Sequence, residues 1–201
     1  MSKKLCCFCG IRPATTRDHI PPKCVFPEPR PVDLITVPAC EECNKSTASI
    51  DEEFRVFVNL FVGKKSPEAE RLWRLRTLST VKSNRRLLNK AISAFQPGYV
   101  TPKHKIILWD DSPHRIFEKM VRGLYFHHFN EVLADRVDII IDQIKEMTTA
   151  KVECVKSLSC NYIGCGQFLY RYGRANDDPL RSVWLFVFHR NLVVMGQTNP
   201  V

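Results

Sequence analysis

The sequence lacks any long apolar run. No stretch approaches the roughly 20 apolar residues that a membrane-spanning helix needs, so no membrane partner is expected. It also shows no secretory signal, because Met1 to Lys4 leads directly into Leu5-Cys6-Cys7 with no apolar core behind the lysines. Internal repeats and low-complexity tracts are absent, and a composition of 44% hydrophobic and 25% charged residues argues against wholesale disorder. We therefore expect a globular protein of the reducing cytoplasm.

The nine cysteines indicate metal binding rather than disulfides. An odd number cannot pair completely within one chain, and in a reducing compartment clustered cysteines more often bind metal. Cys6-x-x-Cys9 and Cys40-x-x-Cys43 have the spacing of two zinc hooks, which can place four thiolates around Zn²⁺ at about 2.3 Å each. Such a site is structural, since four protein ligands leave no open position for a substrate. The cysteines that match no hook spacing are Cys7, Cys24, Cys154, Cys160 and Cys165.

The net charge of +9 is concentrated in one segment. Basic and acidic side chains balance in residues 1–60 and again in residues 106–201, whereas residues 61–105 hold eleven basic side chains and only two acidic ones. One interpretation is a solvated helix surface. The other, which we favour because the imbalance exceeds what solubility needs, is a phosphate-binding face. The residues expected to contact nucleic acid there are Lys82, Arg85 and Arg86.

Apolar periodicity predicts an α+β fold. A helix is expected over 51–61, and a second helical stretch over 67–95 that breaks near 79–80 or 83–84. In that stretch Leu72, Leu75 and Leu78 continue the helical spacing. Ser112-Pro113 begins a further helix. Strands are expected at 105–109, 137–144, 167–172, 182–189 and 192–196, the last three as an antiparallel meander.

Composition and elements together divide the chain into three regions. Residues 1–62 form a small module that depends on zinc for its folding energy. Residues 63–104 form the basic helical segment, and residues 105–201 form an α+β domain with an antiparallel sheet. This last domain carries no recognisable motif. It could read a feature of DNA, form a homodimer or bind a ligand.

The first 60 residues also carry an ordered set of short motifs. The tract D-H-I-P-P occupies positions 18–22 between the two hooks, Asp33-Leu34 follows it, and Asn44 comes directly after Cys43. In this order the motifs resemble the zinc-containing form of the HNH endonuclease family, over less than a third of the chain. The resemblance implies a ββα-metal fold, in which two strands bear the Asp-His pair and a helix follows the second hook.

The resemblance also implies a mechanism. His19 would be the general base that activates water, a task that suits the pKa of histidine. Asp18 and Asn44 would hold one catalytic Mg²⁺ or Mn²⁺, since carboxylate and amide oxygens suit these ions. Zinc at the four cysteines would be purely structural. Arg17 and Lys23 flank the Asp-His pair, and they either contact the scissile phosphate or are ordinary surface charges.

Two positions depart from the family pattern. The family usually has an asparagine five residues before the second hook, where this chain has Ile35. Either Asp33, two residues earlier, orients His19 through a lengthened strand, or another group does so. The last position of the motif is Asn44 where histidine is also common, and this asparagine could instead simply cap a helix.

The favoured hypothesis is therefore a metal-dependent endonuclease acting on nucleic acid, with double-stranded DNA as the expected partner. A zinc-held nucleic-acid-binding or regulatory protein without catalysis is the alternative. A protein-interaction adaptor with a structural zinc knuckle is the third reading, and it would bind its partner with little dependence on salt.

Overall fold

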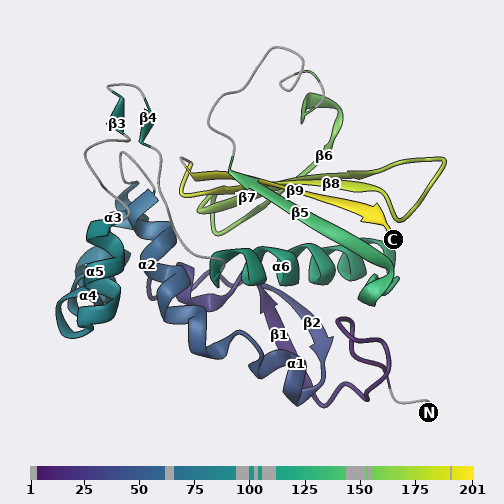
Figure 1. Cartoon of the computed structure of the whole chain (residues 1–201), viewed down its shortest axis with the longest axis horizontal. Helices are drawn as coiled ribbons and strands as arrows, with labels where there is room; N and C mark the ends of the chain where they lie inside the picture. The colour runs from purple at the N-terminus through teal and green to yellow at the C-terminus, as the bar shows by residue number, and fades with distance from the viewer. Residues whose placement is uncertain are drawn as a thin grey trace.

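The computed structural model shows an α+β architecture in which one helix lies between two β structures. A five-stranded sheet forms one layer, helix α6 crosses beneath it, and a two-stranded hairpin packs on the other side of α6 (Figure 1). No helix among the described residues is long and apolar enough to cross a membrane. The structure describes residues 4–61, 66–93, 100–101, 104–105, 112–143, 153, 155–190 and 192–201.

The N-terminal part is a hairpin followed by helices. Strands β1 (Thr16–Ile20) and β2 (Ile35–Ala39) pair antiparallel, and the short helix α1 (Glu41–Lys45) follows directly. Helix α2 (Asp51–Phe61) then begins with three acidic residues, which complement the positive end of its dipole. The predicted helix over 51–61 is confirmed with these bounds. Two single 3₁₀ turns complete the region, at Lys23–Val25 and Ala48–Ile50.

The basic segment folds as three short helices against α2. They are α3 (Pro67–Leu72), α4 (Leu78–Ser83) and α5 (Arg85–Ser93), so the second of the two predicted break positions is confirmed, with extended backbone at Asn84. One detail of the periodicity is wrong, because the stretch between α3 and α4 is wound as a π-helix, which shifts the buried face. Leu75 is consequently 60% exposed, whereas Thr77 is fully buried.

Helix α6 (Ser112–Phe129) packs against both β structures and leaves His114 and Arg115 exposed near its start. Its Phe117 ring stacks on Phe186 of the sheet at 6.2 Å between centroids. On the hairpin side, a Cβ on Gly123 would lie 2.8 Å from the Ile20 side chain, so glycine permits the close approach of α6 to β1. The helix therefore buries two faces at once, and one core cluster runs through the hairpin, the helix and the sheet.

The C-terminal part is an antiparallel sheet in the order β5-β9-β8-β7-β6. The predicted meander and the expected strand over 137–144 are confirmed up to Gln143, whereas the edge strand β6 was missed because its sequence is polar. The two short strands β3 (Val100–Thr101) and β4 (His104–Lys105) pair separately, and the rest of the strand expected at 105–109 lies outside the described residues. The five strands are β5 (Val137–Gln143), β6 (Ser159–Ile163), β7 (Phe168–Arg174), β8 (Ser182–Phe188) and β9 (Leu192–Pro200).

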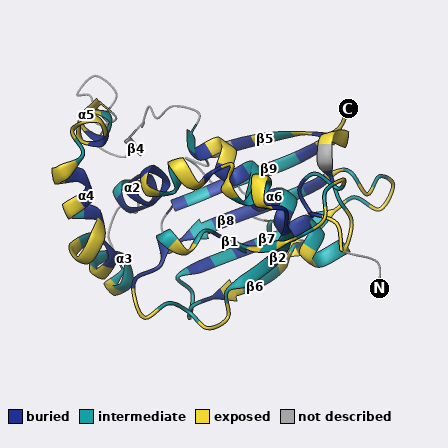
Figure 2. Cartoon of the chain, turned by 90° about the horizontal axis from the view of Figure 1, so that it is seen from below, coloured by how far each residue is buried: buried dark blue, intermediate teal, exposed yellow. Residues whose placement is uncertain are grey.

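Aromatic side chains fill the inner face of this sheet. They lie against α6 and, apart from the half-buried Tyr172, are fully buried, and Figure 2 shows the contrast between this buried layer and the exposed surfaces of α3–α5. Aromatic cross-strand neighbours stabilise a sheet beyond the area that they bury. Three aromatic pairs lie directly opposite each other on neighbouring strands: Phe168 and Phe188, Tyr170 and Phe186, and Tyr172 and Trp184.

Candidate metal centre and polar pocket

The four hook cysteines converge at the base of the hairpin. Their sulfur atoms, on Cys6, Cys9, Cys40 and Cys43, all lie within 4.8 Å of one another. A tetrahedral Zn²⁺ with bonds of about 2.3 Å places its sulfurs about 3.8 Å apart, so the cluster could hold a structural zinc ion. The first hook is shaped by local turns, in which the Gly10 amide donates to the Cys6 carbonyl at 2.9 Å. The second hook lies where β2 meets α1.

A guanidinium group lies against this cluster. Arg12 donates from Nε to Cys40 Sγ at 3.3 Å and from a terminal nitrogen to Cys43 Sγ at 3.6 Å. Although burial opposes ionisation, the Cys43 backbone amide and the Arg12 guanidinium lower the pKa of the Cys40 thiol to about 6. Four thiolates and one Zn²⁺ would carry a net charge near −2, which a neighbouring arginine partly offsets.

The predicted catalytic residues come together in a separate pocket of about 360 Å³. Asp18 and His19 enter it from β1, and Asn44 enters it from α1. The start of α2 and the middle of α6 supply further walls through Asp51 and Lys119. The pocket is thus built by one strand and three helices from both halves of the chain.

The Asp-His pair is held by its strand. One Asp18 oxygen accepts a hydrogen bond from the His19 backbone amide at 2.8 Å. The His19 side chain is half-buried, and burial, followed by the charge of Lys23, lowers the pKa of its imidazole. A lowered pKa keeps the ring neutral near pH 7, which is the form that can accept a proton.

The side-chain amide nitrogen of Asn44 is held by two hydrogen bonds. Its Nδ2 donates to the Thr16 hydroxyl at 3.0 Å and to the Arg17 carbonyl at 3.4 Å. These bonds leave the Oδ1 lone pairs available to a cation. The capping alternative is wrong, because Asn44 lies inside α1 and the cap of that helix is Cys40, whose sulfur accepts from the Cys43 amide.

Two pocket residues were missed from the sequence. Lys119 of α6 places its Nζ 2.6 Å from Asp18 Oδ2, and both side chains are largely buried. Asp51 at the start of α2 is the second, and burial raises the pKa of its carboxyl to about 6. Neither residue belongs to a short motif. Lys119 is 101 positions from Asp18 along the chain, and only the packing of α6 against β1 brings these two residues together.

Asp33 does not orient His19. Both of its carboxylate oxygens accept from the Gly164 backbone amide at 3.1 Å, in the turn between β6 and β7. Across the hairpin, the register partner of His19 is Thr36. Asp33 therefore ties the hairpin loop to the C-terminal sheet, and strand pairing positions the histidine.

The basic residues expected at nucleic acid separate into two groups. Arg17 and Lys23 line the pocket, and Arg17 also donates to the Thr36 hydroxyl across the hairpin at 2.9 Å. Lys82, Arg85 and Arg86 are exposed on α4 and α5. Helix α2 lies between those helices and α6, so the second group lines no part of the pocket (Figures 1 and 2).

Two histidines of the C-terminal part make ring-stacking or hydrogen-bond contacts. His128 stacks on Tyr172 with ring centroids 3.9 Å apart. A ring nitrogen of the buried His189 lies 3.1 Å from the Val25 carbonyl. Within the described part of the chain, the four-cysteine group is the one cluster suited to a metal. Cys154 is not among the described residues.

Known proteins add no further identification to this geometry. No family model, no curated protein and no solved structure matches the chain.

Proposed function

We propose that the chain is a metal-dependent endonuclease that hydrolyses phosphodiester bonds in DNA. Its first 62 residues would form a zinc-stabilised ββα-metal module of the HNH type, with β1, β2 and α1 as its parts. The observation that carries the proposal is the pocket of about 360 Å³, whose wall brings Asp18, His19 and Asn44 together beside the four-cysteine cluster. Three residues separated by up to 26 positions meet there with the chemistry that phosphodiester hydrolysis needs.

In this mechanism His19 accepts the proton of the attacking water, since its neutral imidazole is the base form. Asp18 and the Asn44 Oδ1 atom would hold Mg²⁺ or Mn²⁺. They are hard oxygen donors, but two ligands are fewer than the six that Mg²⁺ takes, so water and phosphate oxygens would have to supply the others. When bound, such an ion offsets the negative charge that develops on the phosphate and on the leaving 3′ oxygen.

The surrounding cations would orient the substrate. Arg17 and Lys23 line the same pocket, where they can contact the phosphate that is cleaved. Lys82, Arg85 and Arg86 would bind the DNA backbone at a distance from the chemistry, because they lie on the exposed side of the basic helices. The pocket would thus determine cleavage, and the basic helices would determine affinity.

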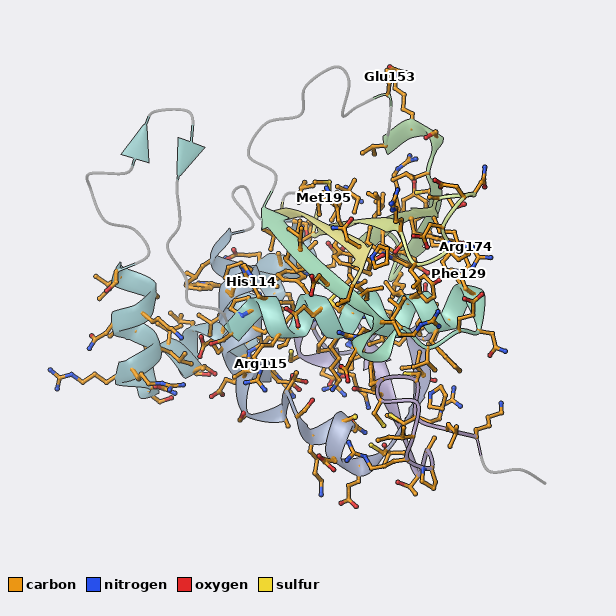
Figure 3. The ribbon with its side chains drawn as sticks, turned by 45° about the vertical axis from the view of Figure 1, so that its right-hand side comes forward. His114, Arg115, Phe129, Glu153, Arg174 and Met195 are labelled. Atoms are coloured by element: carbon orange, nitrogen blue, oxygen red, sulfur yellow. The ribbon has the colours of Figure 1, made fainter. Side chains whose placement is uncertain are left out.

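The test is a plasmid nicking assay in Mg²⁺, in Mn²⁺ and in EDTA, run with the zinc-loaded wild type and with His19→Ala. The wild type should nick supercoiled DNA only with a divalent ion. His19→Ala should lower the rate by about 10²–10⁴-fold, the usual contribution of a general base. His114→Ala is the matched control, because His114 is an exposed histidine at the start of α6 that does not line the pocket (Figure 3). Equal nicking by the wild type and His19→Ala would remove His19 from the mechanism.

One observation favours the non-catalytic alternative. The Asp18 carboxylate is already paired with Lys119 at 2.6 Å, and such a pair would suit a polar site that has a structural role alone. A zinc-held protein that only binds nucleic acid would shift DNA in a gel through its basic helices and leave supercoiled plasmid intact after prolonged incubation with Mn²⁺. The same assay therefore separates the two functions.

A further inference from the structure

Lys119 lies where its ammonium group interacts with three parts of the pocket. Besides the pair with Asp18 Oδ2 at 2.6 Å, its Nζ donates to the Asn44 carbonyl and to the Thr47 hydroxyl, both at 3.1 Å. Two of the three ammonium donors are thus used in hydrogen bonds, and the contact with Asp18 Oδ2 is an ion pair by its distance alone. The same Nζ lies 5.2 Å from the centre of the Phe8 ring. Lys119 is only 11% exposed, and its position is therefore closely defined.

The close approach of α6 to β1 explains this position. Gly123 lies one turn after Lys119 on the same face of α6, and Ile20 lies two residues after Asp18 on the same face of β1. The contact between Gly123 and Ile20 consequently brings Lys119 to Asp18 as well. A larger residue at position 123 would push α6 away from β1 and so move Lys119 away from Asp18.

The ammonium group therefore competes with any divalent ion for one carboxylate. An ion held by Asp18 and Asn44 needs an Asp18 oxygen, and Oδ2 already carries a unit positive charge at hydrogen-bond distance. The other oxygen, Oδ1, accepts from the His19 backbone amide. Two cations cannot share Oδ2 at bonding distance without strong repulsion.

We propose that Lys119 is a resident counter-cation, which holds Asp18 while the divalent ion is absent and releases it to contact the substrate phosphate when ion and DNA bind. This inference rests on the proposed endonuclease function. After release, the Asn44 carbonyl and the Thr47 hydroxyl still accept from Nζ, so the ammonium stays at the pocket wall. Lys119 is on this account a positioning residue for the carboxylate and a phosphate ligand in the loaded state, contributed by a helix outside the HNH-like module.

The first test measures Mn²⁺ affinity of the zinc-loaded protein without DNA, by electron paramagnetic resonance of free Mn²⁺. Lys119→Met removes the charge but keeps the apolar stem, so it should bind Mn²⁺ about tenfold more tightly than the wild type, because an unpaired carboxylate attracts the ion more strongly. Lys119→Arg, which keeps a cation there, should remain within about threefold of the wild type. Unchanged or weaker Mn²⁺ binding by Lys119→Met would overturn the inference.

Arg115→Met is the matched control. Arg115 lies one turn earlier on α6 and donates to the Ser46 carbonyl of the same region at 3.3 Å, but it does not line the pocket (Figure 3). Its loss removes one cation and one contact between α6 and the α1 region, so Mn²⁺ affinity should not change. If Lys119→Met loses zinc or its cooperative melt, Lys119→Gln replaces it, since an amide still donates to Asn44 and Thr47 without the charge.

The second test separates the inference from the proposed function. At saturating Mn²⁺, Lys119→Met should lower kcat for plasmid nicking at least tenfold while KM for DNA changes little, and Lys119→Arg should recover part of the rate. An unchanged kcat would overturn the phosphate contact. If the wild type does not nick DNA at all, the endonuclease proposal fails, but the Mn²⁺ titration still decides whether Lys119 and a divalent ion compete for Asp18.

Discussion

The hairpin module, formed by β1, β2 and α1, and the C-terminal sheet differ in the interactions that can stabilise them. The module has two strands of five residues each and a five-residue helix, and four clustered cysteines at its base. The sheet has five strands, and directly paired aromatic rings fill its inner face. Small units often use a structural metal to supply folding energy, whereas a large aromatic layer supplies it through burial. The candidate chemistry lies on the hairpin side, where the four-cysteine cluster could hold a structural zinc ion and where the apolar side chains share one core with α6 and the sheet.

The largest difference between the two regions is expected when one of the four clustered cysteines is replaced. In Cys40→Ser the zinc content should fall, and the free energy of unfolding should decrease on the order of 5 kcal/mol or more, because structural zinc binds zinc-finger peptides with roughly 10–16 kcal/mol. Amide hydrogen exchange read by mass spectrometry should show lost protection in β1 and retained protection in β8. Cys165→Ser, a change of an exposed cysteine outside the cluster, should leave both strands protected. Persistent protection of β1 in zinc-free Cys40→Ser would contradict the dependence on metal.

A smaller loss of stability is expected from a substitution at the contact between α6 and the hairpin. Gly123→Ala places a Cβ 2.8 Å from the Ile20 side chain, which overpacks the contact between α6 and β1. We expect a loss of about 1–3 kcal/mol from overpacking, reduced by the roughly 1 kcal/mol that alanine gains over glycine in a helix. Urea denaturation measures it. The double variant with Ile20→Ala should be destabilised by less than the sum of the two single changes. Strict additivity would show that the two residues do not limit the approach of α6.

The basic helices belong to neither region, so changing their charge should have the smallest effect on the fold. Arg85→Glu with Arg86→Glu should weaken DNA binding and flatten the dependence of log K on log salt by about 2, since each lost phosphate contact contributes about 0.9. Zinc content should not change. Arg86 is 76% exposed and contacts the buried Glu53 at 3.5 Å, so the reversed charge should also lower the free energy of unfolding. Fluorescence anisotropy at several salt concentrations measures the binding, and wild-type affinity in this variant would place the DNA-binding face elsewhere.

Local signals in the sequence were sufficient for most elements. Runs rich in β-forming residues predicted β7 and β8, and Ser112-Pro113 predicted the start of α6, because these patterns depend on neighbours along the chain. The polar edge strand β6 was missed because an edge strand is specified by its partner rather than by its own alternation. The exposure of Leu75 was missed because a π-helical stretch changes the period that the pattern assumes.

The sequence by itself determined the four-cysteine cluster and the residues that line one side of the pocket. Hook spacing is a short-range property, so Cys6 to Cys9 and Cys40 to Cys43 could be read without any tertiary contact, and the Asp18-His19 pair came from the resemblance of the short motifs to the HNH family. Only the tertiary structure decided that Lys119 completes the pocket. That residue reaches Asp18 because α6 packs between the hairpin and the sheet, and no spacing along the chain encodes how closely two such surfaces approach.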